Sequence, residues 1–160
     1  MESYRPRVIL SAAISLDGKL ATRTGDSKLS SQRDKIRVHK LRSRFDAILV
    51  GKNTVEIDDP LLAVQGIKGK NPVRVILDSR ATIRASSKIL RTCSKIPTII
   101  AVSKMAKKKN LEKLKKFPVM VKVCGNNKIN IKKLLKFLKE KKIKNLLVEG
   151  GGITNWSFVK

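Results

Sequence analysis

The sequence has few of the residues on which several protein classes depend. Its two cysteines, Cys93 and Cys124, are too few and too widely spaced for a disulfide framework or a zinc knuckle. The single histidine, His39, has no cluster of metal ligands around it and is expected to be an exposed or half-packed helix residue. The H-x-E and P-C-x-x-C elements of a zinc deaminase are missing. No apolar run approaches the roughly 18 residues of a membrane span. We therefore expect no metal site and no membrane span, and we predict a cytoplasmic protein.

Acidic and aromatic side chains are also scarce. Twelve Asp and Glu stand against 37 Lys and Arg, so the formal net charge is +25 and any polyanion is a plausible partner. The most basic part, residues 101–160, contains lysine but no arginine, and only 4% of all residues are aromatic. Arginine forks and aromatic stacking platforms are the usual means of nucleic-acid recognition. A nucleic-acid partner is therefore disfavoured, and Lys104–Lys116 and Lys128–Lys144 are interpreted as solvated helix faces.

The chain does contain short apolar runs that alternate with helical patterns. A helix is predicted from the capping residue Ser31 to about Phe45, and later stripes of Leu and Phe lie among the lysines. The alternation predicts an α/β fold with a mostly parallel central sheet and flanking helices. With 160 residues, we expect one domain spanning residues 1–160. The predicted strands are Arg7–Ser15, Asp46–Gly51, Val73–Leu77, Pro97–Val102, Val119–Val123 and Leu146–Val148. The strands from Asp46–Gly51 onward are nearly all apolar, so we expect them to be buried on both faces of the sheet.

A glycine-rich turn follows the last predicted strand. Glu149 ends that strand, Gly150, Gly151 and Gly152 follow, and Ile153–Val159 can begin a helix. Bare N–H groups at such a helix start suit a phosphate or a dinucleotide, and ligands of open α/β sheets bind at the carboxyl ends of strands. A tight corner that requires positive φ explains the glycines equally well, since the G-x-G-x-x-G fingerprint is missing.

Polar residues also follow two other predicted strands. Thr54 and Asp58 follow one, either as part of a site in the same crevice or as caps of a short helix before a turn. Ser79 and Arg80 follow the other, where they suit the 2′-phosphate of NADP or are simply solvated. No activated nucleophile accompanies them. Sites that offer phosphate-binding turns and little chemistry of their own usually borrow a cofactor.

Taken together, these segments resemble the riboflavin-pathway reductases that act on 2,5-diamino-6-ribosylamino-4(3H)-pyrimidinone 5′-phosphate. These enzymes are similar to the C-terminal domain of bacterial bifunctional riboflavin deaminase-reductases. The resemblance implies a dihydrofolate-reductase-like fold and NADPH-dependent reduction of the ribosylamino side chain to its ribitylamino form. The matching stretches are Ser15–Lys19, Gly25–Ser27, Val50–Thr54, Asp58–Pro60, Pro72–Ser79, Val148–Gly152 and Asn155–Trp156.

The resemblance also implies roles for individual residues. Lys19 and Glu149 are the implied catalytic residues, and Ser27 and Arg42 the implied substrate ligands. The residues implied to hold NADPH are Thr54, Asp58, Ser79, Arg80, Gly150, Gly151 and Gly152.

The sequence departs from the family pattern in two respects. Gln65 stands near the position where bacterial relatives carry a basic residue against the substrate phosphate, so Lys68 or Arg42 alone is expected to make that contact. Relatives also continue past Asn155–Trp156 into further strands. We therefore interpret the chain as truncated at its C-terminus and expect a homodimer of the complete protein. A dihydrofolate-reductase-type enzyme and a non-enzymatic basic module that binds nucleic acid remain the alternatives.

Overall fold

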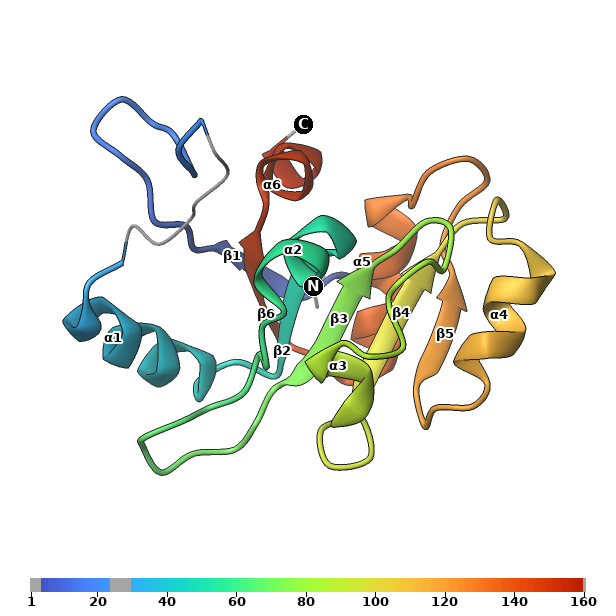
Figure 1. Cartoon of the computed structure of the whole chain (residues 1–160), viewed down its shortest axis with the longest axis horizontal. Helices are drawn as coiled ribbons and strands as arrows, with labels where there is room; N and C mark the ends of the chain where they lie inside the picture. Colours follow the sequence, from blue (N-terminus) through green and yellow to red (C-terminus); the bar gives the residue numbers. More distant parts are fainter. Residues whose placement is uncertain (1–3, 24–29, 160) are drawn as a thin grey trace.

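A six-stranded sheet forms the centre of the computed structural model, which describes residues 4–23 and 30–159 (Figure 1). The strand order is β1-β6-β2-β3-β4-β5, and every neighbouring pair is parallel. Within the described ranges no helix is both long and apolar enough to cross a membrane. The strands are β1 (Arg7–Leu10), β2 (Ala47–Gly51), β3 (Val73–Leu77), β4 (Thr98–Val102), β5 (Met120–Val123) and β6 (Asn145–Gly150). The helices are α1 (Gln32–Arg42), α2 (Lys52–Asp58), α3 (Lys88–Arg91), α4 (Lys108–Leu114), α5 (Ile131–Glu140) and α6 (Gly152–Val159).

The last strand along the chain, β6, lies between β1 and β2. Leu146 of β6 is in register with Val8 on one side and Ala47 on the other. The Asp46 carboxylate holds the start of this strand, because its Oδ2 accepts the backbone N–H groups of Lys144 and Asn145, both at 2.8 Å. The carboxyl ends of β6 and β2 therefore meet at one edge of the sheet.

Helices cover both faces of the sheet, and each face has its own apolar core. Leu49 and Val148 pack on the side of α5, against Leu134 and other buried residues of that helix. Ile48, one position earlier on β2, faces the other core, where α2, α3 and α4 pack. The predicted alternation of strands and half-apolar helices is confirmed, with buried residues in β2, β3, β4 and β6. The sheet is parallel throughout the described strands rather than mostly parallel.

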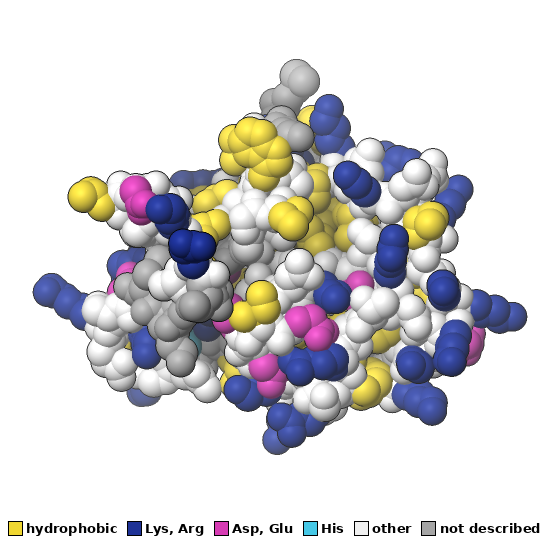
Figure 2. All heavy atoms as spheres, turned by 45° about the horizontal axis from the view of Figure 1, so that its top comes forward, with side chains coloured by type: hydrophobic (Ala, Val, Ile, Leu, Met, Phe, Trp, Pro, Cys, Tyr) yellow, Lys and Arg dark blue, Asp and Glu magenta, His cyan; other side chains and the backbone are white. Residues whose placement is uncertain are grey.

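The lysine-rich stretches form exposed helix faces, as predicted. In α5 the leucines Leu134 and Leu138 are buried, whereas Lys132, Lys133 and Lys136 are exposed. Lys and Arg side chains are spread over the surface in Figure 2, with only a few acidic groups among them. The apolar stripe therefore stabilises the helix against the sheet, while the charged face stays hydrated.

Two sequence predictions need correction, and one short helix was missed. Val119–Val123 was expected to form a strand buried on both faces, but β5 is the edge strand and all four of its residues are exposed. Arg7–Ser15 forms a strand only as far as Leu10. The short helix α3 was not predicted at all, because four residues carry too little periodicity to recognise. The helix start at Ser31 is confirmed, since its hydroxyl accepts the N–H of Asp34 at 3.2 Å.

The buried side chain of Arg74, on β3, forms hydrogen bonds that connect the loop before β3, the helix α3 and the start of β4. Its side chain is fully buried, and its nitrogen atoms donate to hydroxyl and carbonyl oxygens, with none of these bonds to a carboxylate. Burial lowers the pKa of Arg74 to about 10, because the charged form loses its hydration. The acceptors are Thr98 Oγ1 at 2.8 and 3.0 Å, Thr92 Oγ1 at 2.8 Å, Ile89 O at 2.8 Å, and Leu61 O and Ile96 O at 3.2 Å.

We predict that Arg74→Ala lowers the free energy of unfolding by about 3 kcal/mol, because it opens a cavity and leaves buried carbonyl groups without a donor. Urea unfolding measures this loss. The matched control is Arg91→Ala, on the exposed side of α3, which should change the free energy by no more than about 0.5 kcal/mol. Equal stability of the two variants would contradict the role given to Arg74.

Candidate functional site

The glycine turn at the end of β6 has the strained geometry that only glycine adopts easily. Gly150 has φ of +86° and Gly151 has φ of +80°. A Cβ on Gly150 would lie 2.8 Å from Asn155 Oδ1, and one on Gly151 would lie 2.9 Å from Thr54 Oγ1. Positive φ angles and close packing therefore explain the glycines of this turn. This explanation does not exclude a ligand, because the first N–H groups of α6 have no carbonyl partner within that helix.

The end of β2 packs against the same turn. The Thr54 hydroxyl, in α2, donates to the Gly150 carbonyl at 3.4 Å. Gly51 lies so close to α6 that an added Cβ would approach Thr154 Oγ1. Nearby, the buried Oδ1 atom of Asn155 has no hydrogen-bond partner among the described residues. A group outside the chain that donates a hydrogen bond would satisfy this buried atom.

On the other side of the turn, Glu149 forms a two-pronged ion pair with Arg42 of α1. Arg42 Nε donates to Glu149 Oε1 at 2.9 Å, and Nη2 donates to Oε2 at 2.7 Å. Both side chains are mostly buried, with 14% of Arg42 and 13% of Glu149 exposed. Arg42 Nη1 also donates to the Ala63 carbonyl at 3.3 Å, so three of the five guanidinium N–H groups are used within the protein.

A hollow of about 270 Å³ opens beside this ion pair. It lies between the segment that follows β1 and the inner face of α1. Lys35, His39 and Arg42 are spaced four and three residues apart, so they share one face of the helix. The hollow is lined by Ser11, Ala12, Ala13, Ser30, Asp34, Lys35, Arg37, Val38, His39, Arg42 and Glu149.

Sequence reasoning found Arg42 and Glu149 but missed the residues around them. Lys35 was not considered. His39 was expected to be exposed or half-packed, and it is half-buried, but its place in the lining of the hollow was not predicted. The spacing of Lys35, His39 and Arg42 on one helix face was the available signal. Lys68, offered as a substitute phosphate ligand, is exposed and does not line the hollow.

Lys19 lies in an exposed loop rather than in this hollow. Its ammonium group pairs with Asp17 at 2.6 Å, and 72% of its side chain is exposed. The Lys19 ammonium and the Ser15 hydroxyl hold the pKa of Asp17 below its ordinary value. The structure thus does not bring Lys19 to Glu149. Ser27, the other residue expected on the substrate side, lies outside the described residues.

Asp58 occupies the last position of α2 and is exposed. The neighbouring Asp59 ends the helix, with a left-handed φ of 39°, and accepts the N–H of Lys88 at the start of α3 at 2.8 Å. The capping interpretation that the sequence allowed therefore applies to Asp59. Asp58, Thr54 and the glycine turn all follow neighbouring strands of the sheet.

Ser79 and Arg80 follow β3 at the same edge. The Ser79 carbonyl accepts the Ser103 hydroxyl at 2.8 Å, and the Arg80 carbonyl accepts the side-chain amide of Asn110 at 3.0 Å. These bonds fix the loop backbone, while the Arg80 side chain is exposed. An exposed guanidinium at this position is accessible to a phosphate group.

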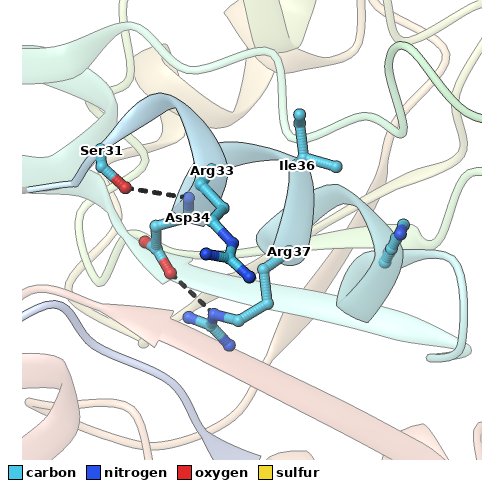
Figure 3. A pocket seen from close by; sticks show the side chains of 6 residues that line it. Ser31, Arg33, Asp34, Ile36 and Arg37 are labelled. Atoms are coloured by element: carbon cyan, nitrogen blue, oxygen red, sulfur yellow. Dashed lines mark hydrogen bonds and ion pairs between the residues drawn. The ribbon is translucent and has the colours of Figure 1, made fainter.

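A second hollow, of about 460 Å³, lies along α1 and is a weaker candidate (Figure 3). Its lining residues all come from α1 and its capping residue Ser31, with none from the glycine turn. Asp34 pairs there with Arg37 at 2.7 Å, an interaction that lowers the pKa of Asp34. The remaining lining residues are Arg33, Ile36 and Lys40. A single helix surface of this kind offers no converging groups from different elements.

A parallel sheet with a glycine turn, a helix start and a buried ion pair at its carboxyl edge defines an α/β domain of the ligand-binding type. Residues 6–160 match the RibD C-terminal domain family, and the chain belongs to that family. The chain is 42% identical over 158 residues to the 2,5-diamino-6-ribosylamino-4(3H)-pyrimidinone 5′-phosphate reductase of Methanothermobacter thermautotrophicus, covering 97% of this chain and 72% of the relative.

Solved structures agree with this assignment. The deaminase/reductase of Thermotoga maritima matches with a TM-score of 0.78 and 30% identity over 97% of this chain and 42% of that protein. The riboflavin biosynthesis reductase Rib7 of Saccharomyces cerevisiae matches with a TM-score of 0.73 and 28% identity over 96% of this chain and 66% of that protein. The chain thus spans less than half of the deaminase/reductase. The expected dihydrofolate-reductase-like fold is confirmed.

We predict that the Arg42–Glu149 pair is worth about 1–2 kcal/mol in a double-mutant cycle of Arg42→Gln and Glu149→Gln, because both groups are mostly buried. Urea unfolding of the two single variants and the double variant measures the coupling. The exposed pair Glu112–Lys115, with 50% of Glu112 and 71% of Lys115 exposed, serves as the control and should couple by less than about 0.5 kcal/mol. Equal coupling in both cycles would show that burial does not strengthen the Glu149 pair.

Proposed function

We propose that this chain carries the reductase step that reduces the ribosylamino side chain of a diaminopyrimidinone 5′-phosphate to the ribitylamino form, with NADPH as the reductant. The observation that carries the proposal is the buried Arg42–Glu149 pair beside the glycine turn at the carboxyl edge of the sheet. The relatives bear the name of this reductase, and the chain spans most of their length. Family and geometry thus support the same reaction class.

The residues at the glycine turn fit a nicotinamide dinucleotide. The exposed backbone of Gly151 and Gly152 lies at the N-terminus of α6, where N–H groups and the helix dipole favour a pyrophosphate. We propose that Thr54 and Asp58 contact the cofactor from α2, and that Ser79 and Arg80 lie near the adenosine phosphate. The exposed Arg80 guanidinium supports a preference for NADPH over NADH. When bound, the nicotinamide supplies the hydride.

On the substrate side, Arg42 and Glu149 have complementary tasks. Glu149 faces the hollow and can stabilise the positively charged iminium nitrogen that forms when the sugar ring opens, as the ring oxygen leaves the anomeric carbon and takes up a proton. Reduction of that carbon then removes the charge. Arg42 orients both oxygens of that carboxylate and keeps further N–H groups for an anionic substrate. Lys35 extends the cationic face of α1 along the same hollow, where it can attract the substrate phosphate. Water is partly excluded there because the ion pair is mostly buried.

Two further residues and the state of the working enzyme complete the proposed function. We retain Lys19 and Ser27 as proposed substrate-side residues on the strength of the resemblance, with Lys19 acting from the loop after β1. We also propose that the working enzyme is a cytoplasmic homodimer that acts on a small molecule rather than on nucleic acid. The lysine faces of α4 and α5 then serve hydration rather than recognition.

We predict that Glu149→Gln lowers kcat at least about a hundredfold with little change in the KM for NADPH, because the neutral amide cannot stabilise the positively charged iminium form of the substrate. Analysis of the product formed at fixed times measures kcat. Parallel assays with the pyrimidine phosphate and with dihydrofolate distinguish the two possible substrates. Glu140→Gln, at the exposed end of α5, is the control. An unchanged kcat in the Glu149 variant would rule out its catalytic role, and turnover of dihydrofolate alone would overturn the proposed substrate.

We predict that Gly151→Ala weakens NADPH binding at least about tenfold, because a side chain there is strained at φ of +80° and meets Thr54. Calorimetry in moderately high salt measures the affinity, with NADH and ATP as controls for simple attraction to a basic protein. Gly66→Ala is the matched variant, since Gly66 has φ of +70° but open space around it. Equal weak binding of NADPH, NADH and ATP by the native chain would contradict a nicotinamide site.

A further inference from the structure

The short helix α2 connects two parts of the proposed cofactor site. Near its start, the Thr54 hydroxyl donates to the Gly150 carbonyl of the glycine turn at 3.4 Å. At its other end, Glu56 and Asp59 contact the segment that follows β3. Only Val55 of the helix is buried, and no side chain caps its first turn. The position of α2 therefore depends largely on the polar contacts at its two ends.

Three contacts join Arg84, in the segment between β3 and α3, to Glu56 of α2. Arg84 Nε pairs with Glu56 Oε2 at 2.9 Å, the Arg84 backbone N–H donates to Oε1 at 3.3 Å, and Nη2 donates to the Glu56 backbone carbonyl at 3.0 Å. The usual donor to that carbonyl is missing, because the residue four positions later is Pro60, which has no N–H. The Lys88 N–H donates to Asp59 Oδ1 at 2.8 Å, so the end of α2 is attached to this segment at two points.

The loop that carries Ser79 and Arg80 is held independently of α2. The buried Asp78 carboxylate accepts the Ile83 N–H at 2.7 Å, which closes the loop on itself. Donors that follow β4 and lie on α4 bind the carbonyls of Ser79 and Arg80. Arg84 therefore joins a helix with little buried surface to a loop that has its own supports.

The Arg84–Glu56 pair is better suited to fixing a direction than to stabilising the fold. Because 49% of Arg84 and 26% of Glu56 are exposed, water screens the ion pair, and such pairs contribute little to global stability. The contacts nevertheless use a side chain and a backbone group of both residues, which restricts how the end of α2 can move.

We propose that Arg84 is a positioning residue of the cofactor site, which holds α2 through Glu56 and so fixes Thr54 and Asp58 relative to the Ser79–Arg80 loop. This inference rests on the proposed function, because it assigns those residues to NADPH. A dinucleotide that contacts both segments binds best when their spacing is set before it arrives. Arg84 acts through α2 and needs no contact with the cofactor.

The first test requires neither substrate nor cofactor. Hydrogen exchange followed by peptide mass analysis compares the native chain with Glu56→Ala and Arg84→Met. We expect the amides of α2 to exchange at least about fivefold faster in both variants, while those of Asp78–Ile83 and α5 stay within about twofold. Lys88→Met is the matched control, because it removes a nearby positive charge but keeps the backbone bond to Asp59. Native exchange rates for α2 in both variants would overturn the proposal.

The second test measures binding by calorimetry in moderately high salt. We expect Glu56→Ala and Arg84→Met each to weaken NADPH binding about tenfold, and the double variant to bind no more weakly than either, because the two residues act as a unit. Adenosine 2′,5′-bisphosphate can reach Ser79 and Arg80 without α2, so its affinity should stay within about twofold of the native value. Lys88→Met should change neither affinity.

The Glu56 variant distinguishes positioning from simple electrostatic attraction. Glu56→Ala removes a negative charge from a chain of net charge +25, so attraction alone would make NADPH bind more tightly. The positioning role requires weaker binding instead. Global unfolding does not produce this result, and we expect the thermal midpoints of both single variants to lie within about 4 °C of the native value.

The outcomes separate this inference from the proposed function. If the native chain binds NADPH selectively but does not reduce the pyrimidine phosphate, the proposed reaction has failed and the binding data still decide the role of Arg84. Unchanged or tighter NADPH binding by Glu56→Ala, additive losses in the double variant, or an equal loss of adenosine 2′,5′-bisphosphate binding would each overturn the inference. Equal binding of NADPH, NADH and ATP by the native chain would overturn both. If one single variant fails to fold, the other carries the test.

Discussion

The insertion of β6 between β1 and β2 is the constraint on which the rest of the structure depends. Without β6 the first strand has no neighbour, because among the described strands β1 pairs with β6 alone. The insertion requires the chain to return across the whole sheet after β5 and α5. It also places the last glycine turn next to the end of β2, so that Thr54 and Gly150 meet although 96 residues separate them. The site is a consequence of strand order.

Basic residues far outnumber acidic residues in this fold. With 12 acidic residues for 37 basic ones, few carboxylates are present, and two of them act at the two ends of β6. Asp46 holds the start of β6 through backbone N–H groups, and Glu149 holds Arg42 at its end. The buried Arg74 is bonded instead to neutral carbonyl and hydroxyl oxygens, which satisfy its N–H groups at the cost of a lowered pKa. Most other basic groups remain at the surface, where water solvates them.

Much of the fold was predictable because local pattern and burial agree. The apolar runs of β2, β3 and β4 and the leucine stripe of α5 were predicted close to their observed bounds. The burial of β5 was predicted wrongly, since apolar residues look alike in a central strand and in an edge strand. In the site, the glycine turn and Glu149 were visible as a strand-to-helix motif. Lys35 and His39 were not, because their importance depends on what faces α1, which periodicity does not encode.

The sequence by itself determined the class of fold, the alternation of strands and helices, the glycine turn and the excess of surface lysine. These features depend on residue type and on near neighbours in the chain, so they are readable without coordinates. Only the tertiary structure decided that Arg42 pairs with Glu149, that Asp59 rather than Asp58 caps α2, and that His39 meets Gln65. The contacts of Arg42 with Glu149 and of His39 with Gln65 join segments that lie far apart in the sequence, and the conformation of Asp59 depends on how the end of α2 packs. Their energies depend on distance and burial, which are properties of the folded chain alone.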